Sequence, residues 1–170
     1  MKVAALGFAL LLCLTSFQPY YKTENLCKKH EEVIYTFKLL NSSKVISICK
    51  DKENQYLVYR FGTGKKIEFE YPGKLDSSSW KAFELYGLKR FGGKFNAGFG
   101  DYSLAFYDNG VKYEVFERWS DEEESQGTGV RVTVNGKETL LKGSLKSREG
   151  SLLRLDDESE RIENRAGEEE

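Results

Sequence analysis

Residues 104–115 have the sequence LAFYDNGVKYEV, which predicts a β-hairpin. After the turn, apolar residues alternate with Lys112 and Glu114, the spacing of a strand with one buried face. Between the two apolar runs, Asn109-Gly110 favours positive φ at both turn positions, which is the strongest short-range hairpin signal. We therefore expect two antiparallel strands, at 101–107 and 111–119.

The same pattern recurs along most of the chain. Ile67, Phe69 and Tyr71 alternate with polar residues, and Asn135-Gly136 separates two further alternating runs. In all, about eight strands are expected, at 33–40, 44–50, 55–61, 66–71, 101–107, 111–119, 129–134 and 137–142. Because the links are mostly short, the chain is expected to be all-β, an antiparallel hairpin meander forming a small barrel or a sandwich.

Residues 74–100 interrupt this rhythm. The apolar residues of 80–91 fit a helix or a strand equally well. The glycine-rich run 92–100 predicts a flexible or bulged connection, with a binding loop that presents Phe95 and Phe99 as the alternative. The acidic run 120–124 predicts a solvated turn.

Composition sets the class of protein. The chain has 170 residues, 39% of them hydrophobic and 14% aromatic, which fits one β-rich domain, expected at 17–155. Collagen-like, coiled-coil and polytopic membrane proteins are excluded. His30 is the only histidine, so a site with several histidine ligands is excluded as well. No cofactor and no metal site are expected.

The N-terminus predicts export. Lys2 precedes twelve residues without charge, a length typical of a signal peptide and too short for a transmembrane helix. We expect a signal peptide at 1–16 and a periplasmic or secreted protein without a transmembrane span in its mature chain. Lipid attachment at Cys13 is the alternative.

Two cysteines lie beyond this leader, Cys27 and Cys49. An even number in an exported chain predicts one disulfide, worth about 3 kcal/mol for a loop of this length. A pair of free or catalytic thiols is the alternative.

Charge is unevenly distributed. Residues 156–170 hold eight acidic and two basic residues, which predicts a disordered acidic tail. The alternative is that this tail covers a basic surface of its own body. The rest of the chain is only mildly basic, so no nucleic-acid partner is expected.

No catalytic residue can be assigned from the sequence. A hydrolase triad would have to use His30, which lies in a polar link, and 27 acidic residues give no means of choosing a carboxylate pair. Two features could carry binding. One is a surplus of aromatic residues that could stack on sugars or anchor an interface, including Trp80, Trp119, Phe95, Phe99 and Tyr107. The other is a partner-binding set of basic residues that facing hairpins would gather at one rim. Its members are Arg60, Lys65, Lys66, Lys89, Arg90 and Lys94.

The chain contains a set of short motifs: Leu26-Cys27, Glu31-Val33-Tyr35, Lys44-Val45-Ser47-Cys49, Tyr59-Arg60-Phe61-Gly62, Glu68-Phe69-Tyr71-Pro72, Leu104-Phe106-Asn109-Gly110-Tyr113-Val115-Phe116 and Gly129-Val130-Arg131-Val132. Together they resemble those of a family of small exported bacterial proteins of unassigned function. The resemblance implies export and a β-rich fold. Relatives often carry another cysteine near the last strand, which 140–143 lacks. A looser similarity, of architecture alone, exists with periplasmic lysozyme inhibitors.

The sequence therefore favours an exported, non-catalytic binding or inhibitory module of the cell envelope that recognises a protein partner. The alternatives are a glycan-binding protein or carboxylate-dependent glycan hydrolase, and a structural envelope component.

Overall fold

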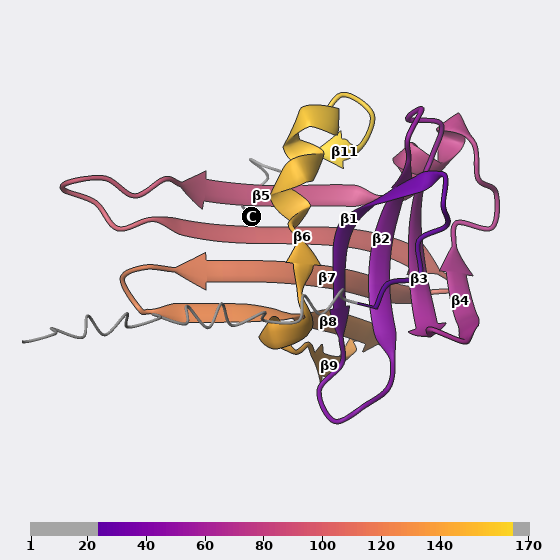
Figure 1. The fold of residues 1–170 in the computed structure, drawn as a ribbon, viewed down its shortest axis with the longest axis horizontal. Coiled ribbons are helices and arrows are strands. Elements are labelled where there is room, and N and C mark those ends of the chain that lie inside the picture. The colour runs from indigo at the N-terminus through magenta and orange to yellow at the C-terminus, as the bar shows by residue number, and fades with distance from the viewer. Residues whose placement is uncertain (1–23, 165–170) are drawn as a thin grey trace, which may run out of the picture.

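The fold was determined as a computed structural model, which describes residues 24–164 (Figure 1). The predicted signal peptide at 1–16, Cys13 and the last six residues of the predicted tail lie outside the described residues. Among the residues described, no helix is long and apolar enough to cross a membrane.

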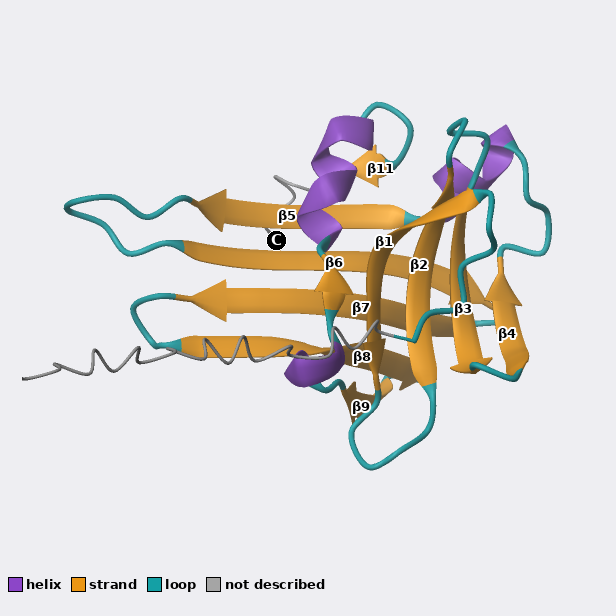
Figure 2. Ribbon diagram, in the orientation of Figure 1, coloured by secondary structure: helices purple, strands orange, loops and turns teal. Residues whose placement is uncertain are grey.

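The described chain is mostly β-structure, with three short 3₁₀ helices (Figure 2). In chain order the elements are β1 (Glu31–Lys38), β2 (Val45–Asp51), β3 (Leu57–Thr63), β4 (Lys66–Tyr71), η1 (Ser77–Ala82), β5 (Glu84–Arg90), β6 (Phe99–Asp108), β7 (Val111–Ser120), β8 (Ser125–Val134), β9 (Lys137–Lys142), η2 (Leu145–Ser147), β10 (Glu149–Gly150), η3 (Leu152–Glu158) and β11 (Glu163–Asn164). The predicted all-β class is confirmed, and each of the eight predicted strands is present.

Two sheets divide the strands. One has the order β10-β1-β2-β3-β4 and the other β11-β5-β6-β7-β8-β9, so consecutive strands pair as predicted for a meander. The sheets pack face to face with their strands crossing, as Figure 1 shows. They approach each other at one corner, where an isolated bridge joins Leu39 to Gly143. The two sheets stay separate, so the fold is a sandwich and not a closed barrel.

The turn chemistry is as predicted. Asn109 and Gly110 have φ of 49° and 78°, and Asn135 and Gly136 have 49° and 76°. These left-handed conformations are what a tight hairpin turn requires. The ambiguous segment 80–91 is resolved as the end of η1 followed by a ninth long strand, β5.

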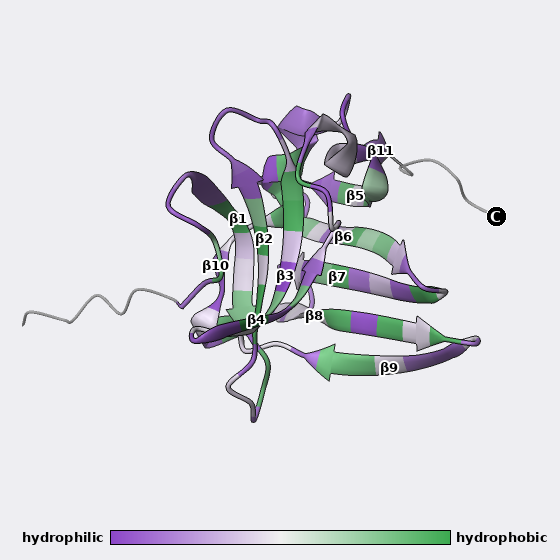
Figure 3. Cartoon of the chain, turned by 90° about the vertical axis from the view of Figure 1, so that its right-hand side faces the viewer, coloured by the Kyte–Doolittle hydropathy of each residue, from purple (hydrophilic) through white to green (hydrophobic). Residues whose placement is uncertain are grey.

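Aromatic side chains fill the space between the sheets. Phe106 of β6 stacks on Tyr71 of β4, with ring centroids 4.3 Å apart, and contacts Tyr59 of β3 at 4.9 Å. On its own sheet it lies 4.9 Å from Tyr113. The alternation behind this arrangement is visible in Figure 3, where hydrophobic and hydrophilic residues follow one another along the strands. Phe106 thus joins the two sheets.

A second, smaller core lies on the outer face of the first sheet. It consists of Cys49, Tyr56 and Val58, with Cys27 and Leu75 packed against them. Cys27 and Cys49 form the predicted disulfide, with their Cα atoms 5.6 Å apart. A disulfide of this kind is typical of proteins in oxidising compartments.

The first nine residues of the predicted disordered tail, 156–164, are part of the fold. Residues 156–158 complete η3, Ile162 is 4% exposed, and 163–164 pair with β5. Acidic side chains of this segment contact basic residues of the body: Asp156 bonds Lys89, and Glu158 bonds Lys50 at 2.8 Å. Residues 156–164 therefore belong to the domain, and their contacts fit the alternative in which the acidic segment covers basic residues.

Truncation after Leu155 is expected to lower the free energy of unfolding by about 1.5–3 kcal/mol, the value of one fully buried aliphatic side chain such as Ile162. Urea denaturation of the full chain and the truncated chain measures the difference. A control chain that ends at residue 164 is expected to match the full chain. Equal stability of the 155-residue chain would contradict the assignment of 156–164 to the fold.

Candidate functional site

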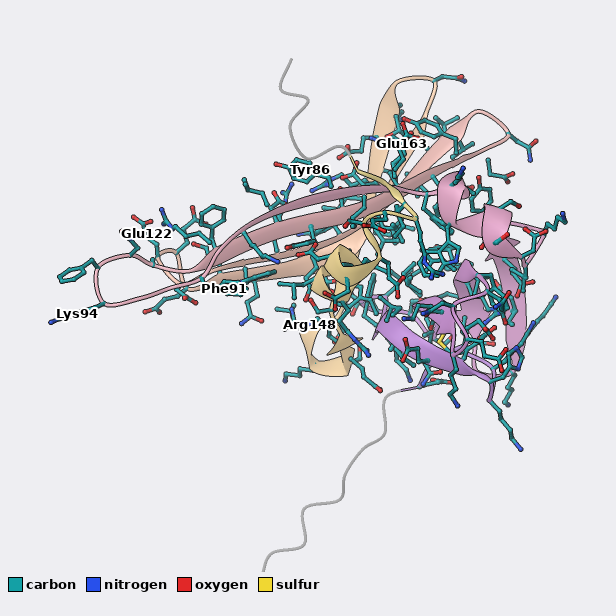
Figure 4. The ribbon with its side chains drawn as sticks, turned by 90° about the horizontal axis from the view of Figure 1, so that it is seen from above. Tyr86, Phe91, Lys94, Glu122, Arg148 and Glu163 are labelled. Atoms are coloured by element: carbon teal, nitrogen blue, oxygen red, sulfur yellow. A yellow bond between two sulfur atoms is a disulfide. The ribbon has the colours of Figure 1, made fainter. Side chains whose placement is uncertain are left out.

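Two hairpins of the second sheet, β5–β6 and β7–β8, project beyond the first sheet (Figure 1). Figure 4 shows Lys94 and Glu122 at the far end of this projection, with Phe91 close behind. We call residues 91–98 together with 120–124 the hairpin tip. Loops carried on a rigid scaffold are where binding residues concentrate, so this end is the first candidate for function.

Hydrogen bonds join the two loops of the tip to each other. The N–H of Gly98 donates to Asp121 Oδ2 at 3.1 Å, and the N–H of Asp121 donates to the carbonyl of Gly98 at 2.9 Å. A Cβ at Gly98 would lie 2.9 Å from the backbone nitrogen of Gly92, so this close approach of backbone to backbone requires glycine. Arg90 Nε donates to the carbonyl of Ala97 at 3.0 Å, which closes the base of the loop. The glycine-rich run is therefore an organised turn.

Aromatic rings at the tip are open to solvent. Phe95 is 86% exposed and Phe91 74%, the largest values among the exposed large hydrophobic side chains. The Lys94 ammonium lies 5.4 Å from the Phe95 ring centroid, and the Lys89 ammonium lies 5.5 Å from that of Phe91. These contacts are within cation–π range, so a lysine ammonium group lies over the face of each exposed ring.

The tip carries both signs of charge. Its β5–β6 side has Lys94 and, at the end of β5, Arg90. Its β7–β8 side has the acidic run 121–124, whose four side chains are all exposed. The predicted solvated turn at 120–124 is therefore one half of a bipolar surface.

The structure separates the predicted partner-binding set into three groups. Lys89, Arg90 and Lys94 lie on the β5–β6 hairpin, near the tip. Lys65 and Lys66 lie at the β3–β4 turn, at the opposite end of the molecule in Figure 1. The single rim expected from the sequence does not form.

Arg60 is fully buried, so its assignment to a partner-binding surface is corrected. Its Nη2 donates to Glu31 Oε1 at 2.9 Å, its Nε donates to Glu70 Oε2 at 2.6 Å, and its Nη1 donates to the carbonyl of Leu26 at 3.2 Å. Tyr56 also donates to Glu31, at 2.7 Å. Arg60 holds the fold together and offers no donor to a partner.

The charge state of Glu31 follows from this network. Burial alone would raise the pKa of the Glu31 carboxyl. Hydrogen bonds from Arg60, Tyr56 and the backbone of Lys28, together with the charge of Arg60, outweigh burial and lower that pKa to about 2. Glu31 is therefore a carboxylate at neutral pH.

Sequence reasoning found Phe95 and missed Phe91. Phe91 is the last residue of the segment 80–91, whose apolar pattern fits a helix or a strand equally well. Because β5 ends at Arg90, the ring of Phe91 lies outside the sheet. Phe99, the other aromatic residue expected in a binding loop, begins β6, where the guanidinium of Arg90 covers its ring at 5.0 Å.

Metal binding has one geometric candidate among residues 24–164, the group Cys27, Glu31 and Cys49. The two sulfur atoms are joined to each other, and the Glu31 carboxylate is paired with Arg60. This group therefore offers no free thiolate to an ion.

Comparison with protein-family models, curated proteins and solved structures finds no match for this chain. The resemblance to small exported bacterial proteins therefore stays a prediction.

Proposed function

We propose that the protein is an exported binding module that recognises a folded protein partner through the hairpin tip. The observation that carries the proposal is the exposure of Phe91 and Phe95 on a projecting, internally bonded turn. Exposed aromatic side chains are costly in water, and they are enriched at the centre of protein interfaces, where they fill pockets. The partner should offer an apolar cleft for these rings.

The charges at the tip favour a protein over a polyanion. A nucleic acid or an acidic polysaccharide attracted to Lys94 would meet the acidic run 121–124 on the neighbouring loop. Both loops lie within hydrogen-bonding contact of each other, less than one Debye length of about 8 Å. A protein surface can carry separate patches of opposite sign that match both loops.

Export agrees with two features of the chain. The uncharged run that follows Lys2 predicts a signal peptide, and the disulfide between Cys27 and Cys49 suits an oxidising compartment. The proposed partner therefore belongs to the cell envelope or the medium outside it.

Replacing Phe95 by alanine is expected to weaken partner binding at least tenfold, because an aromatic hot-spot side chain contributes about 2 kcal/mol or more. Folding should be unaffected, since the ring is 86% exposed. The partner is first captured from an envelope extract with mild cross-linking, then purified and titrated against each variant by calorimetry.

Tyr107→Ala is the matched control. Tyr107 is 48% exposed and lies near the other end of β6, next to the β6–β7 turn. Its loss should leave the affinity unchanged. Equal affinities of Phe95→Ala and Tyr107→Ala for the purified partner would overturn the assignment of the hairpin tip.

A further inference from the structure

A hollow of about 560 Å³ lies behind the hairpin tip, between the second sheet and the segment around η3. Its lining includes Glu117, Trp119, Gln126, Arg148, Ser151 and Leu153. Figure 4 shows Arg148 outside the tip, nearer the body of the molecule. We call this the Trp119 hollow; it shares only Ser120, Asp121 and Glu124 with the tip.

The floor of the hollow is aromatic and flat. A Cβ built on Gly100 of β6 would lie 1.9 Å from the indole of Trp119, so the indole lies directly on that strand where glycine leaves room. A Cβ built on Gly87 of β5 would likewise lie 2.6 Å from the ring of Tyr102, so this ring covers Gly87. The two rings are parallel within 6°. Tyr102 is buried and bonds Asp156 of η3, so Trp119 is the part of this floor that η3 leaves partly open.

One wall is fixed by a buried carboxylate. Glu117 is 3% exposed, and its Oε2 accepts hydrogen bonds from the Ser151 hydroxyl at 2.7 Å and the Leu152 N–H at 2.8 Å. Its Oε1 lies 3.4 Å from Nη1 of Arg148, whose side chain is 26% exposed. These contacts hold the Arg148 guanidinium, with its five N–H donors, at the edge of the hollow beside Trp119.

The lining discriminates by charge. The lining contains three carboxylates, Glu117, Asp121 and Glu124, and one cation, Arg148. An anionic ligand would be repelled, and a purely apolar ligand would find only Trp119 and Leu153. Hydroxyl, amide and guanidinium groups around an aromatic floor suit a ligand with many hydroxyl groups and one apolar ring face.

From these features we propose that the Trp119 hollow binds a neutral oligosaccharide, one pyranose ring of which stacks on the indole of Trp119. The C–H bonds on a pyranose face carry partial positive charge and meet the negative face of the indole. The ring hydroxyls exchange hydrogen bonds with Gln126, Ser125 and Arg148 at the rim. This site overlaps the hairpin tip at three residues of its lining but not at Phe91 or Phe95, so either assignment can fail without the other.

The test uses the full chain with its disulfide intact and four tetrasaccharide probes: chitotetraose, cellotetraose, maltotetraose and tetragalacturonate. The chain has two tryptophans, and Trp80 is 2% exposed, so acrylamide quenching reports mainly on Trp119. At least one neutral probe is expected to bind saturably, with a Kd below about 10 mM, and to protect Trp119 from acrylamide. Tetragalacturonate is expected to bind at least tenfold more weakly.

Trp119→Leu is expected to lose at least tenfold in affinity by calorimetry, whereas Phe95→Ala should bind the saccharide normally. Trp80 emission checks that Trp119→Leu folds, and if it does not fold, protection of Trp119 in the unmodified chain decides. Three results would each overturn the proposal: no binding of any neutral probe, binding without protection of Trp119, or equal affinity for tetragalacturonate.

Discussion

Replacing Arg60 by alanine is expected to lower the free energy of unfolding by about 3–5 kcal/mol, the usual cost of breaking a buried ion pair from one side. Both side chains of the Arg60–Glu31 pair have no exposed surface. Without the guanidinium, the Glu31 carboxylate stays buried with hydrogen bonds from Tyr56 and the Lys28 N–H, and with the imidazole of His30 4.0 Å away. Because whole domains are stable by only about 5–15 kcal/mol, this change should be visible in a simple urea titration.

Arg118→Ala is the matched control. Arg118 pairs with Asp101 at 2.9 Å, but the two side chains are 51% and 33% exposed. An exposed pair of this kind contributes about 1 kcal/mol or less. A loss for Arg60→Ala no larger than that for Arg118→Ala would show that the buried pair does not support the fold. Replacing both partners, as Arg60→Met with Glu31→Leu, should recover much of the stability, since no buried charge is then left unpaired.

The pH dependence of the unfolding free energy tests the same network independently. The pKa of Glu31 is about 2 in the folded chain and near 4.5 in an unfolded one. The unfolded chain therefore binds the proton more readily, and stability from this group is present above pH about 5 and is lost as the pH falls toward 2. The loss attributable to Glu31 is on the order of 3 kcal/mol. In Arg60→Ala this part of the acid dependence should shrink, because the cation that lowers the pKa is gone.

Arg60 also shows where sequence reasoning reaches its limit. Tyr59 lies in the space between the sheets and Arg60 lies on the opposite face of β3, as the alternation of side chains along a strand requires. An opposite face is ordinarily exposed to water. Here Leu26 and Cys27 cross that face, tied down by the disulfide and by the bond from Arg60 to the Leu26 carbonyl. Burial of Arg60 thus depends on a segment distant in the chain, which no local pattern reports.

Rules based on short stretches of sequence predicted correctly the features that depend only on local backbone preferences. The Asn-Gly turns at 109–110 and 135–136 need only their own backbone preference, and both formed as predicted. The acidic segment 156–164 is the opposite case. Its composition predicts disorder, but Ile162 has a place in the core and the charges of Asp156 and Glu158 meet lysines from β5 and β2. Of these two lysines, Lys89 was predicted as a partner-binding residue and Lys50 was given no role.

The candidate site was predictable in part for the same reason. Lys89, Arg90 and Lys94 lie close in sequence, so one hairpin brings them to one end of the molecule. Uniting them with Lys65 and Lys66 required knowing how the two sheets cross, and the crossing places the β3–β4 turn at the other end. Trp119 was among the aromatic residues considered for sugar stacking. It faces Gly100 only through the β6–β7 register, so the shape of the hollow could not be predicted from either strand alone.

Phe106 is the residue on which the packing of the two sheets depends most. Its ring contacts Tyr59, Phe69 and Tyr71 of the first sheet, with centroids 4.9, 6.3 and 4.3 Å away. It also contacts Phe83, at the end of η1, and Tyr113 of β7. Replacing it by alanine removes these contacts and leaves a cavity where the strands of the two sheets cross. The expected loss in the free energy of unfolding is about 3–5 kcal/mol.

Phe95→Ala makes the same chemical change at a position 86% exposed, and should alter stability by no more than about 0.5 kcal/mol. Urea titrations of both variants, followed by the emission of buried Trp80, measure the two losses on one scale. The urea dependence of the unfolding free energy should stay unchanged in both, because the surface exposed on unfolding is nearly the same. If Phe106→Ala were as stable as Phe95→Ala, the aromatic cluster would not be what holds the sheets together. The sandwich would then depend on its corner at Leu39 and Gly143 and on η3, whose Leu152 and Leu155 are also fully buried.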